Sequence, residues 1–427
     1  MELQKTQQKN FSREQKAICF VVIMIMFVSS VVGGAMNLLV PIMGKEFNVS
    51  ASMVGLLVTS FTLTVALLSV PSGRLADIIG KKRIFVPGAI LFAIFAMMPV
   101  FAQSFVMLII FRFFKAVGGA MAFSTSTAIL ADAFPEGERG KAVGLLVASM
   151  YIGLMIGPIG AGAMNAHFGW RSFFVFTFVL STITCITAIK ILPKDGKNLQ
   201  GIKLNIFNDI KYIFKLFTGN FVYAFLNIVA LIASGVGYVI VYLMSIYVQV
   251  VMGYPSQTAG IILIAQPILM TMISPYAGKL SDRVSPFKLT ALGVAICAMG
   301  VGVGAFITIN FPLLLVISAL AISGIGFGVF GPSNTIAIMS CVEAKDYGTA
   351  SAVLVAMRYF GYSSTIAVVS LIAGIYMGTV PLAEAEIGVL VLTMRTSFIV
   401  FSVLCVFSVF LAVKCIKHSG KQKSAQI

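Results

Sequence analysis

The chain has 427 residues, of which 59% are hydrophobic and 10% are charged, and its mean hydropathy is +1.02. This composition excludes a soluble globular protein, because the folded surface could not be wetted, and it predicts a protein solvated by lipid. The formal net charge of +16 does not indicate nucleic-acid binding, since the basic residues lie in short loops between apolar segments.

Apolar runs of about 20 residues, the helix length that crosses a hydrocarbon core of about 30 Å, recur along the chain. The short alternating segments of a membrane β-barrel do not appear. The first run is too long for a removable signal peptide and lacks a small-residue cleavage site, so we expect the basic lead-in to be retained. We predict twelve spans, at about 17–40, 51–73, 84–102, 105–131, 140–164, 171–192, 219–250, 256–280, 287–309, 311–336, 347–378 and 389–414.

The loops differ in charge on the two sides of these spans. About 24 of the 30 Lys and Arg residues lie in the N-terminal lead-in, in every second loop or in the tail, and three (Lys45, Arg171 and Arg395) lie on the opposite side. The positive-inside rule therefore predicts a multi-pass protein of the cell (inner) membrane with both termini in the cytoplasm.

We expect three parts: an N-terminal six-helix bundle (1–192), a cytoplasmic linker (193–218), and a C-terminal six-helix bundle with a cytoplasmic tail (219–427). An internal repeat at a spacing of about 208 residues supports two related halves, because residues 140–153 and 348–361 share Gly, Ala, Leu-Val-Ala, Tyr and Gly in register. A second echo pairs residues 73–77 with 278–282.

The loop between spans two and three reads Gly-Arg-Leu-Ala-Asp-Ile-Ile-Gly-Lys-Lys-Arg over residues 73–83. It resembles the signature loop of the major facilitator superfamily, although Ile78 stands where that family usually has a basic residue. The resemblance implies a lock on the inner gate, in which the aspartate caps a helix and the basic residues pair with it. The candidate gating residues are Gly73, Asp77, Gly80, Lys81, Lys82 and Arg83 and, in the second half, Gly278, Asp282 and Arg283.

Span five carries Gly153, Gly157, Pro158 and Gly162, which resemble the glycine-proline signature that the family associates with antiporters. Ala161 replaces one glycine, and ordinary packing of small residues between helices is the alternative interpretation. Residues 242–283 and 168–174 are similar to the drug:proton antiporter (multidrug efflux) branch, which usually has fourteen spans rather than twelve.

Three basic residues fall inside predicted spans: Arg112 and Lys115 in span four and Arg358 in span eleven. Each costs about 2.5–3.5 kcal/mol at the bilayer centre, so we expect each to face a cavity or a partner. For Arg112, snorkelling to the outer surface is an equal alternative. Lys115 occupies a position where the family commonly has glutamine, and it is a candidate proton carrier.

All fourteen acidic residues lie in loops or at span ends, so a purely cationic substrate is poorly supported and we expect an electropositive cavity for neutral or anionic amphiphiles. Any single Asn or Gln in a span is as well explained by an interhelical hydrogen bond as by a substrate contact. The remaining candidate cavity residues are Asn37, Tyr151, Asn227, Tyr238, Tyr242, Gln249, Gln266 and Asn334.

We therefore predict an all-α membrane protein of the major-facilitator fold, with 12 transmembrane helices in two six-helix pseudo-symmetric bundles. The resemblance implies a proton-coupled exporter of small amphiphilic compounds or drugs that works by alternating access. An importer or symporter of small organic anions and a non-transporting membrane sensor are the alternatives. Cysteines without CxxC spacing and the position of both histidines outside the spans argue against a metal site and an enzyme. We expect no cofactor beyond the proton gradient, a small-molecule substrate and membrane lipid as partners, and a monomer.

Overall fold

The computed structural model describes residues 12–47, 49, 51–135, 138–193, 217–343, 346–378 and 386–424. These residues form helices joined by short connections, and no strand occurs among them. Twelve helical segments of the described chain are long and apolar enough to cross a membrane. The predicted all-helical fold with twelve spans is confirmed.

The first six spans follow the predicted order. Several helices run past the predicted ends, because hydropathy marks the hydrocarbon region whereas intrahelical hydrogen bonds continue into the headgroup region. Gly80, with φ of 111°, separates the second helix from the third. The elements are α1 (Arg13–Glu46), α2 (Ala51–Ile79), α3 (Lys81–Met97) with the 3-10 turn η1 (Met98–Phe101), α4 (Phe105–Ala133), α5 (Arg139–Phe168) and α6 (Arg171–Ile191).

The second six spans include one broken helix. The predicted eighth span divides at Ile264, where Pro267 has no N–H to donate to the carbonyl of Leu263. The elements are α8 (Phe221–Ile246) with the π-helical turn η2 (Tyr247–Val251), α9 (Ser256–Leu263), α10 (Ala265–Ser281), α11 (Pro286–Gly304), α12 (Leu313–Met339), α13 (Tyr347–Met377) and α14 (Ile387–Ser424).

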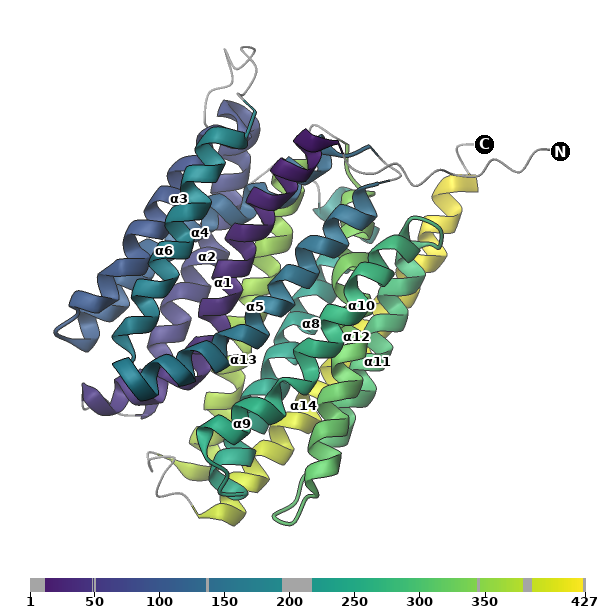
Figure 1. Cartoon of the computed structure of the whole chain (residues 1–427). Helices are drawn as coiled ribbons and strands as arrows, with labels where there is room; N and C mark the ends of the chain where they lie inside the picture. Colours follow the sequence, from purple (N-terminus) through teal and green to yellow (C-terminus); the bar gives the residue numbers. More distant parts are fainter. Residues whose placement is uncertain are drawn as a thin grey trace.

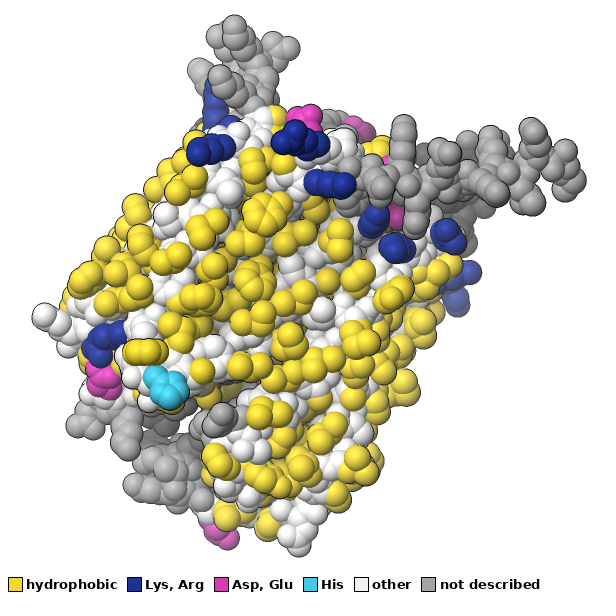
Figure 2. Space-filling model, viewed as in Figure 1, with side chains coloured by type: hydrophobic (Ala, Val, Ile, Leu, Met, Phe, Trp, Pro, Cys, Tyr) yellow, Lys and Arg dark blue, Asp and Glu magenta, His cyan; other side chains and the backbone are white. Residues whose placement is uncertain are grey.

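The outer surface of the helices is apolar. Large side chains such as Leu67, Ile94, Leu371 and Val403 are exposed, and Figure 2 shows hydrophobic side chains covering the flank of the molecule. Most Lys and Arg side chains visible in that view gather at one end, which we call the basic end. An apolar belt of this extent suits lipid rather than water.

The helices before and after the predicted linker form two groups that meet along α2, α4, α5, α10, α12 and α13 (Figure 1). Helices α2 and α4 pack against α13, and α5 packs against α10 and α12. Helix α1 begins and α14 ends at the basic end. The boundaries of the halves stay a prediction, because most of the linker, residues 194–216, lies outside the described residues.

Candidate functional site

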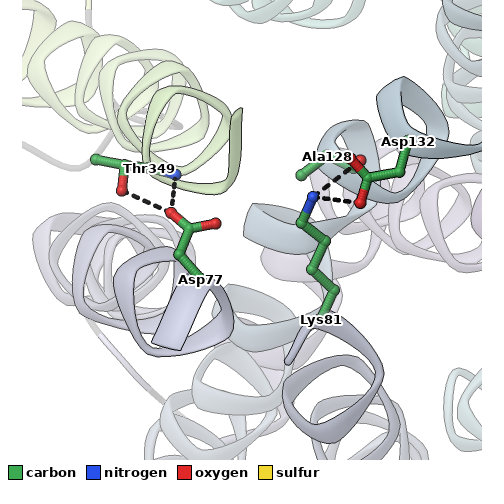
Figure 3. Close-up of polar contacts among 5 residues, drawn as sticks. All are labelled: Asp77, Lys81, Ala128, Asp132 and Thr349. Carbon is green, nitrogen blue, oxygen red and sulfur yellow. Dashed lines mark hydrogen bonds and ion pairs between the residues drawn. The ribbon is translucent and has the colours of Figure 1, made fainter. Parts of the chain in front are cut away.

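At the basic end, a carboxylate of the first half caps a helix of the second. Helix α13 receives no side-chain cap from its own N-terminal residue, Asp346. Instead Asp77, in the last turn of α2, accepts hydrogen bonds from the backbone N–H and the hydroxyl of Thr349, both at 2.8 Å (Figure 3). These bonds satisfy a free amide of the first helical turn, and the negative charge lies at the positive end of the helix dipole. Asp77 therefore fastens α2 to α13.

The second half makes an equivalent contact in return. Helix α5 also lacks a side-chain cap from its N-terminal residue, Glu138. Asp282, which directly follows α10, forms a hydrogen bond with the backbone of Gly140 in the first turn of α5. Burial raises the pKa of Asp282, and this hydrogen bond opposes the rise. Its neighbour Arg283 is exposed. At the basic end, an aspartate of each half thus caps the N-terminus of a helix in the other half.

The glycines of the repeat allow these helices to touch. A methyl group on Gly73 would overlap the side chain of Ala352 and lie 2.8 Å from the carbonyl oxygen of Gly348. A methyl group on Gly278 would lie 2.5 Å from the carbonyl oxygen of Gly140. Both contacts are closer than a real Cβ atom tolerates, so α2 meets α13, and α10 meets α5, through backbone. The repeated residues therefore face each other crosswise.

The basic residues of the loop act elsewhere than expected. We predicted that they pair with Asp77, but Lys81 forms its ion pair with Asp132 of α4 at 2.5 Å (Figure 3). Lys82 donates to backbone carbonyls near the end of α6, and Arg83 donates to the carbonyl of Ile79. These partners belong to the first half, because α3 begins at Lys81 and directs its first turn toward α4 and α6. These contacts bind Lys81, Lys82 and Arg83 to the first half, whereas Asp77 and Gly73 contact the second half.

A cavity of about 270 Å³ lies between the halves. Nine helices or turns of the described chain line it: α1, α2, α3, α4, α5, α8, η2, α12 and α13, together with the broken span α9–α10. On α4 its lining residues stand several turns before Asp132 at the basic end, and on α1 they stand several turns after Arg13. The cavity therefore occupies the half of the molecule away from the closed basic end.

Three cations line this cavity. Arg112 donates from Nε to the carbonyl of Leu57 at 2.5 Å, and Arg358 donates to the hydroxyl of Thr335 at 2.8 Å. Lys115 is 2% exposed, and its ammonium has no hydrogen-bond partner; it lies 4.6 Å from the centre of a neighbouring phenyl ring, that of Phe92. Of the described residues that line the cavity, none is Asp or Glu. The lining is electropositive.

Aromatic rings form much of the remaining wall. Tyr359 stacks on Phe123, with ring centroids 6.3 Å apart and planes 10° from parallel, and packs edge-on against Tyr362. The ring centroid of Tyr238 lies 5.9 Å from that of Tyr362. Tyrosines 359 and 362 were not among the predicted residues, although both closely follow Arg358 on the same helix, α13. Position next to an embedded cation was the signal that could have found them.

The other predicted residues divide into three groups. Those that line the cavity are Arg112, Lys115, Tyr151, Pro158, Tyr238, Gln249, Gln266 and Arg358. Tyr242 stacks behind Tyr238, Asn227 donates to the carbonyl of Tyr223, and Asn334 is buried without a hydrogen-bond partner; none of these three lines the cavity. The side chain of Asn37 lies outside the described part.

Further polar contacts join the two halves at the cavity wall and on its side toward the basic end. Tyr151, Phe327 and Thr62 line the cavity itself, whereas Ser274 and Gly144 lie between the cavity and the basic end. The contacts are Tyr151 hydroxyl to Phe327 carbonyl (3.3 Å), Thr62 hydroxyl with Ser363 hydroxyl (2.8 Å), and Ser274 hydroxyl to Gly144 carbonyl (3.3 Å).

Comparison with known proteins agrees with this architecture. The sequence model of the Major Facilitator Superfamily matches residues 18–365. This chain belongs to the Major Facilitator Superfamily. The riboflavin transporter RibZ of Clostridioides difficile is 25% identical over 398 residues, which cover 82% of this chain and 86% of RibZ. The multidrug efflux pump LfrA of Mycolicibacterium smegmatis is 23% identical over 367 residues, covering 73% of this chain and 72% of LfrA.

A solved structure shares the fold. The human organic anion transporter MFSD10 (TETRAN) superposes with a TM-score of 0.73 over 94% of this chain and 100% of that chain, at 13% identity. The family and its transporter relatives identify the chain as a multi-pass membrane transporter rather than an enzyme.

The glycine-proline segment of this superfamily member packs α5 against α1. A methyl group on Gly153 would lie 2.6 Å from the carbonyl oxygen of Phe27, and one on Gly157 would overlap the carbonyl of Val31. Gly162 has only ordinary contacts, and Pro158 borders the cavity. The first two glycines are therefore explained by close helix packing. A role of the segment in antiport stays a prediction.

The end opposite the basic end carries a separate clamp within the first half. Glu46, at the end of α1, accepts hydrogen bonds from the indole N–H of Trp170 and from Arg171, the latter at 2.7 Å. The guanidinium of Arg171 also lies 4.3 Å from the indole ring centre. The hydrogen bond from Trp170 and the charge of Arg171 lower the pKa of Glu46, against the opposing effect of burial. This clamp ties α1 to α6.

Proposed function

We propose that this superfamily member is a secondary transporter of the cell membrane that exports small amphiphilic compounds in exchange for protons. The observation that carries the proposal is a pair of reciprocal helix caps at the basic end, with a cavity between the halves beyond it. The positive-inside rule makes the basic end cytoplasmic. The conformation is then one in which the cytoplasmic side is closed, and rupture of both caps would close the other side by rocking of the halves.

Two observations support export. The glycine-proline segment at Gly153–Gly162 resembles the mark of antiporters, and two relatives are named as a multidrug efflux pump, LfrA, and as a probable actinorhodin transporter of Streptomyces coelicolor. Those names describe those proteins. For this chain they favour the outward direction.

One observation favours a second candidate, an importer that takes up organic anions together with protons. The lining holds cations at Arg112, Lys115 and Arg358 without an acidic residue among the described lining residues. A carboxylate can hold either a proton or a cation, and this competition drives exchange. A protonated lysine instead attracts an anion, so proton and anion favour each other's binding and travel in the same direction. If Lys115 is the proton carrier, coupling is therefore symport.

Inverted membrane vesicles with an acidic lumen distinguish the two candidates. Under the export proposal, addition of a substrate collapses the pH gradient while the compound accumulates in the lumen. Under the second candidate, the same compound leaves preloaded inverted vesicles together with protons, and a gradient with the acidic side outside drives its uptake into right-side-out vesicles. Flux that does not depend on any proton gradient would exclude both proton antiport and proton symport.

The vesicle assay requires a matched pair of variants. Asp77→Asn weakens the contact between halves, whereas Asp132→Asn breaks an ion pair of the same loop inside one half. We expect flux to fall in the first variant and to persist in the second. Equal loss in both would indicate that the loop matters only for folding.

A further inference from the structure

We infer that the central cavity binds planar aromatic anions, with the ammonium of Lys115 as the counter-ion. The inference rests on the proposed function only in taking this cavity as the substrate site. It goes beyond that function by fixing the charge and the shape of the substrate. Three features of the cavity carry it: an unsatisfied cation, the absence of a carboxylate among the described lining residues, and flat aromatic walls.

Lys115 is a basic residue without a hydrogen-bond partner among the described residues. An ammonium group has three N–H donors, and burying it without acceptors is among the most costly arrangements in a protein. The side chain of Lys115 is 2% exposed, lines the cavity, and lies over the ring face of Phe92. A ligand oxygen that bears negative charge would supply both the missing acceptor and the missing charge.

The two arginines have different surroundings. Arg112 is held by the carbonyl of Leu57, and Arg358 by the hydroxyl of Thr335 and the carbonyl of Gly331. Their charges add to the positive potential of the cavity, but neutral partners fix their positions. Lys115 is thus the cation that the protein leaves for a ligand. A lipophilic cation would meet three positive charges without a compensating carboxylate among the described lining residues.

The aromatic side chains of the wall, two of which contact Lys115 and Arg112, determine ligand shape. Rings of Phe61, Phe92, Tyr238, Tyr359 and Tyr362 all line the cavity. The ring centroids of Phe61 and Tyr359 lie 6.3 Å apart, a separation typical of aromatic packing. Flat rings offer the largest contact to another flat ring system. A cavity of about 270 Å³ admits two or three fused rings rather than a large macrocycle.

Binding to the purified transporter tests the inference without requiring flux. Three probes share one ring system and differ in charge: naphthalene-2-sulfonate, the neutral naphthalene-2-sulfonamide and trimethyl(2-naphthyl)ammonium. A fourth, decahydronaphthalene-2-sulfonate, keeps the charge and loses planarity. Calorimetric titration into protein in lipid nanodiscs gives each dissociation constant, with empty nanodiscs as the blank. We expect naphthalene-2-sulfonate to bind at least tenfold more tightly than each of the other three.

Variants assign the effect to Lys115. Lys115→Gln should weaken sulfonate binding at least tenfold and leave sulfonamide binding within twofold, and Lys115→Arg should retain sulfonate binding. Lys288→Gln, at an exposed position near the basic end, is the matched loss of a lysine and should change nothing. Tyr359→Leu should weaken both naphthalene probes, whereas Phe113→Leu on the exposed face of α4 should weaken neither.

The outcomes separate this inference from the proposed function. Retained sulfonamide binding shows that a variant is folded. Preferential binding of the cationic probe, undiminished sulfonate binding in Lys115→Gln, or no binding of naphthalene-2-sulfonate to the native protein would overturn the inference. Selective anion binding with no proton-linked flux in vesicles would leave the inference standing and remove the proposed function.

Discussion

Replacement of Asp77 by Asn should open the basic end. The carboxylate accepts two hydrogen bonds from Thr349 across the boundary of the halves. Hydrogen bonds to a charged group contribute about 1.5–3 kcal/mol each, against about 0.5–1.5 kcal/mol for neutral ones. The charge at the helix N-terminus adds about 0.3–1 kcal/mol. Asparagine keeps one acceptor oxygen and loses the charge, so we expect a loss of about 1.5–3 kcal/mol and a shift of roughly 10- to 100-fold toward the open state.

Spin-label distance measurements can detect this shift. Lys190 and Lys288 are exposed near the basic end in opposite halves, so cysteines placed there, in a background without native cysteines, report their separation. The native distance distribution should show the closed state, and Asp77→Asn should add or enlarge a longer-distance population. Asp132→Asn is the control. An unchanged distribution in Asp77→Asn, or an equal change in the control, would refute the reasoning.

Two further predictions concern the same gate and the opposite end. Gly278→Ala forces a methyl group against the backbone of α5 and should lengthen the same distances, whereas Gly302→Ala, which meets open space, should not. The sole tryptophan, Trp170, binds Glu46, whose pKa is lowered below its ordinary value of 4.5. The clamp is therefore complete above pH 4.5 and is lost as the pH falls through the lowered pKa. Tryptophan emission should change in that acidic range and become insensitive in Glu46→Gln but not in Glu14→Gln; a Glu46→Gln protein that titrates like the native one contradicts the assignment.

Reading the sequence located single residues better than their partners. The repeat and the loop of residues 73–83 identified Asp77, Asp282 and the glycines at the helix crossings, because close backbone contacts require a particular residue type at a fixed position. The prediction that Lys81 pairs with Asp77 was wrong. Its partner is Asp132, which is 51 residues distant along the chain. A basic residue near an aspartate in the sequence carries no information about an acidic residue that a distant helix brings to it.

For the cavity, too, the sequence identified some lining residues and missed others. Embedded cations at Arg112, Lys115 and Arg358 were recognisable because charge is rare in a lipid-spanning segment. Tyr359 and Tyr362 were not recognised, because a tyrosine in a span fits an interface, a helix contact or a cavity equally well. Asn334 was expected in the cavity and lies buried away from its lining.

The sequence by itself determined that the protein is solvated by lipid, how many spans it has, and which charges lie inside the spans, because hydrophobicity and charge are properties of single positions and short segments. Only the tertiary structure decided that α2 meets α13 while α10 meets α5, that the basic end is closed, and that Lys115 stands without a partner while both arginines are held. These facts depend on which distant segments share space. Helix faces in lipid are apolar on nearly every side, so periodicity does not reveal which face meets which neighbour.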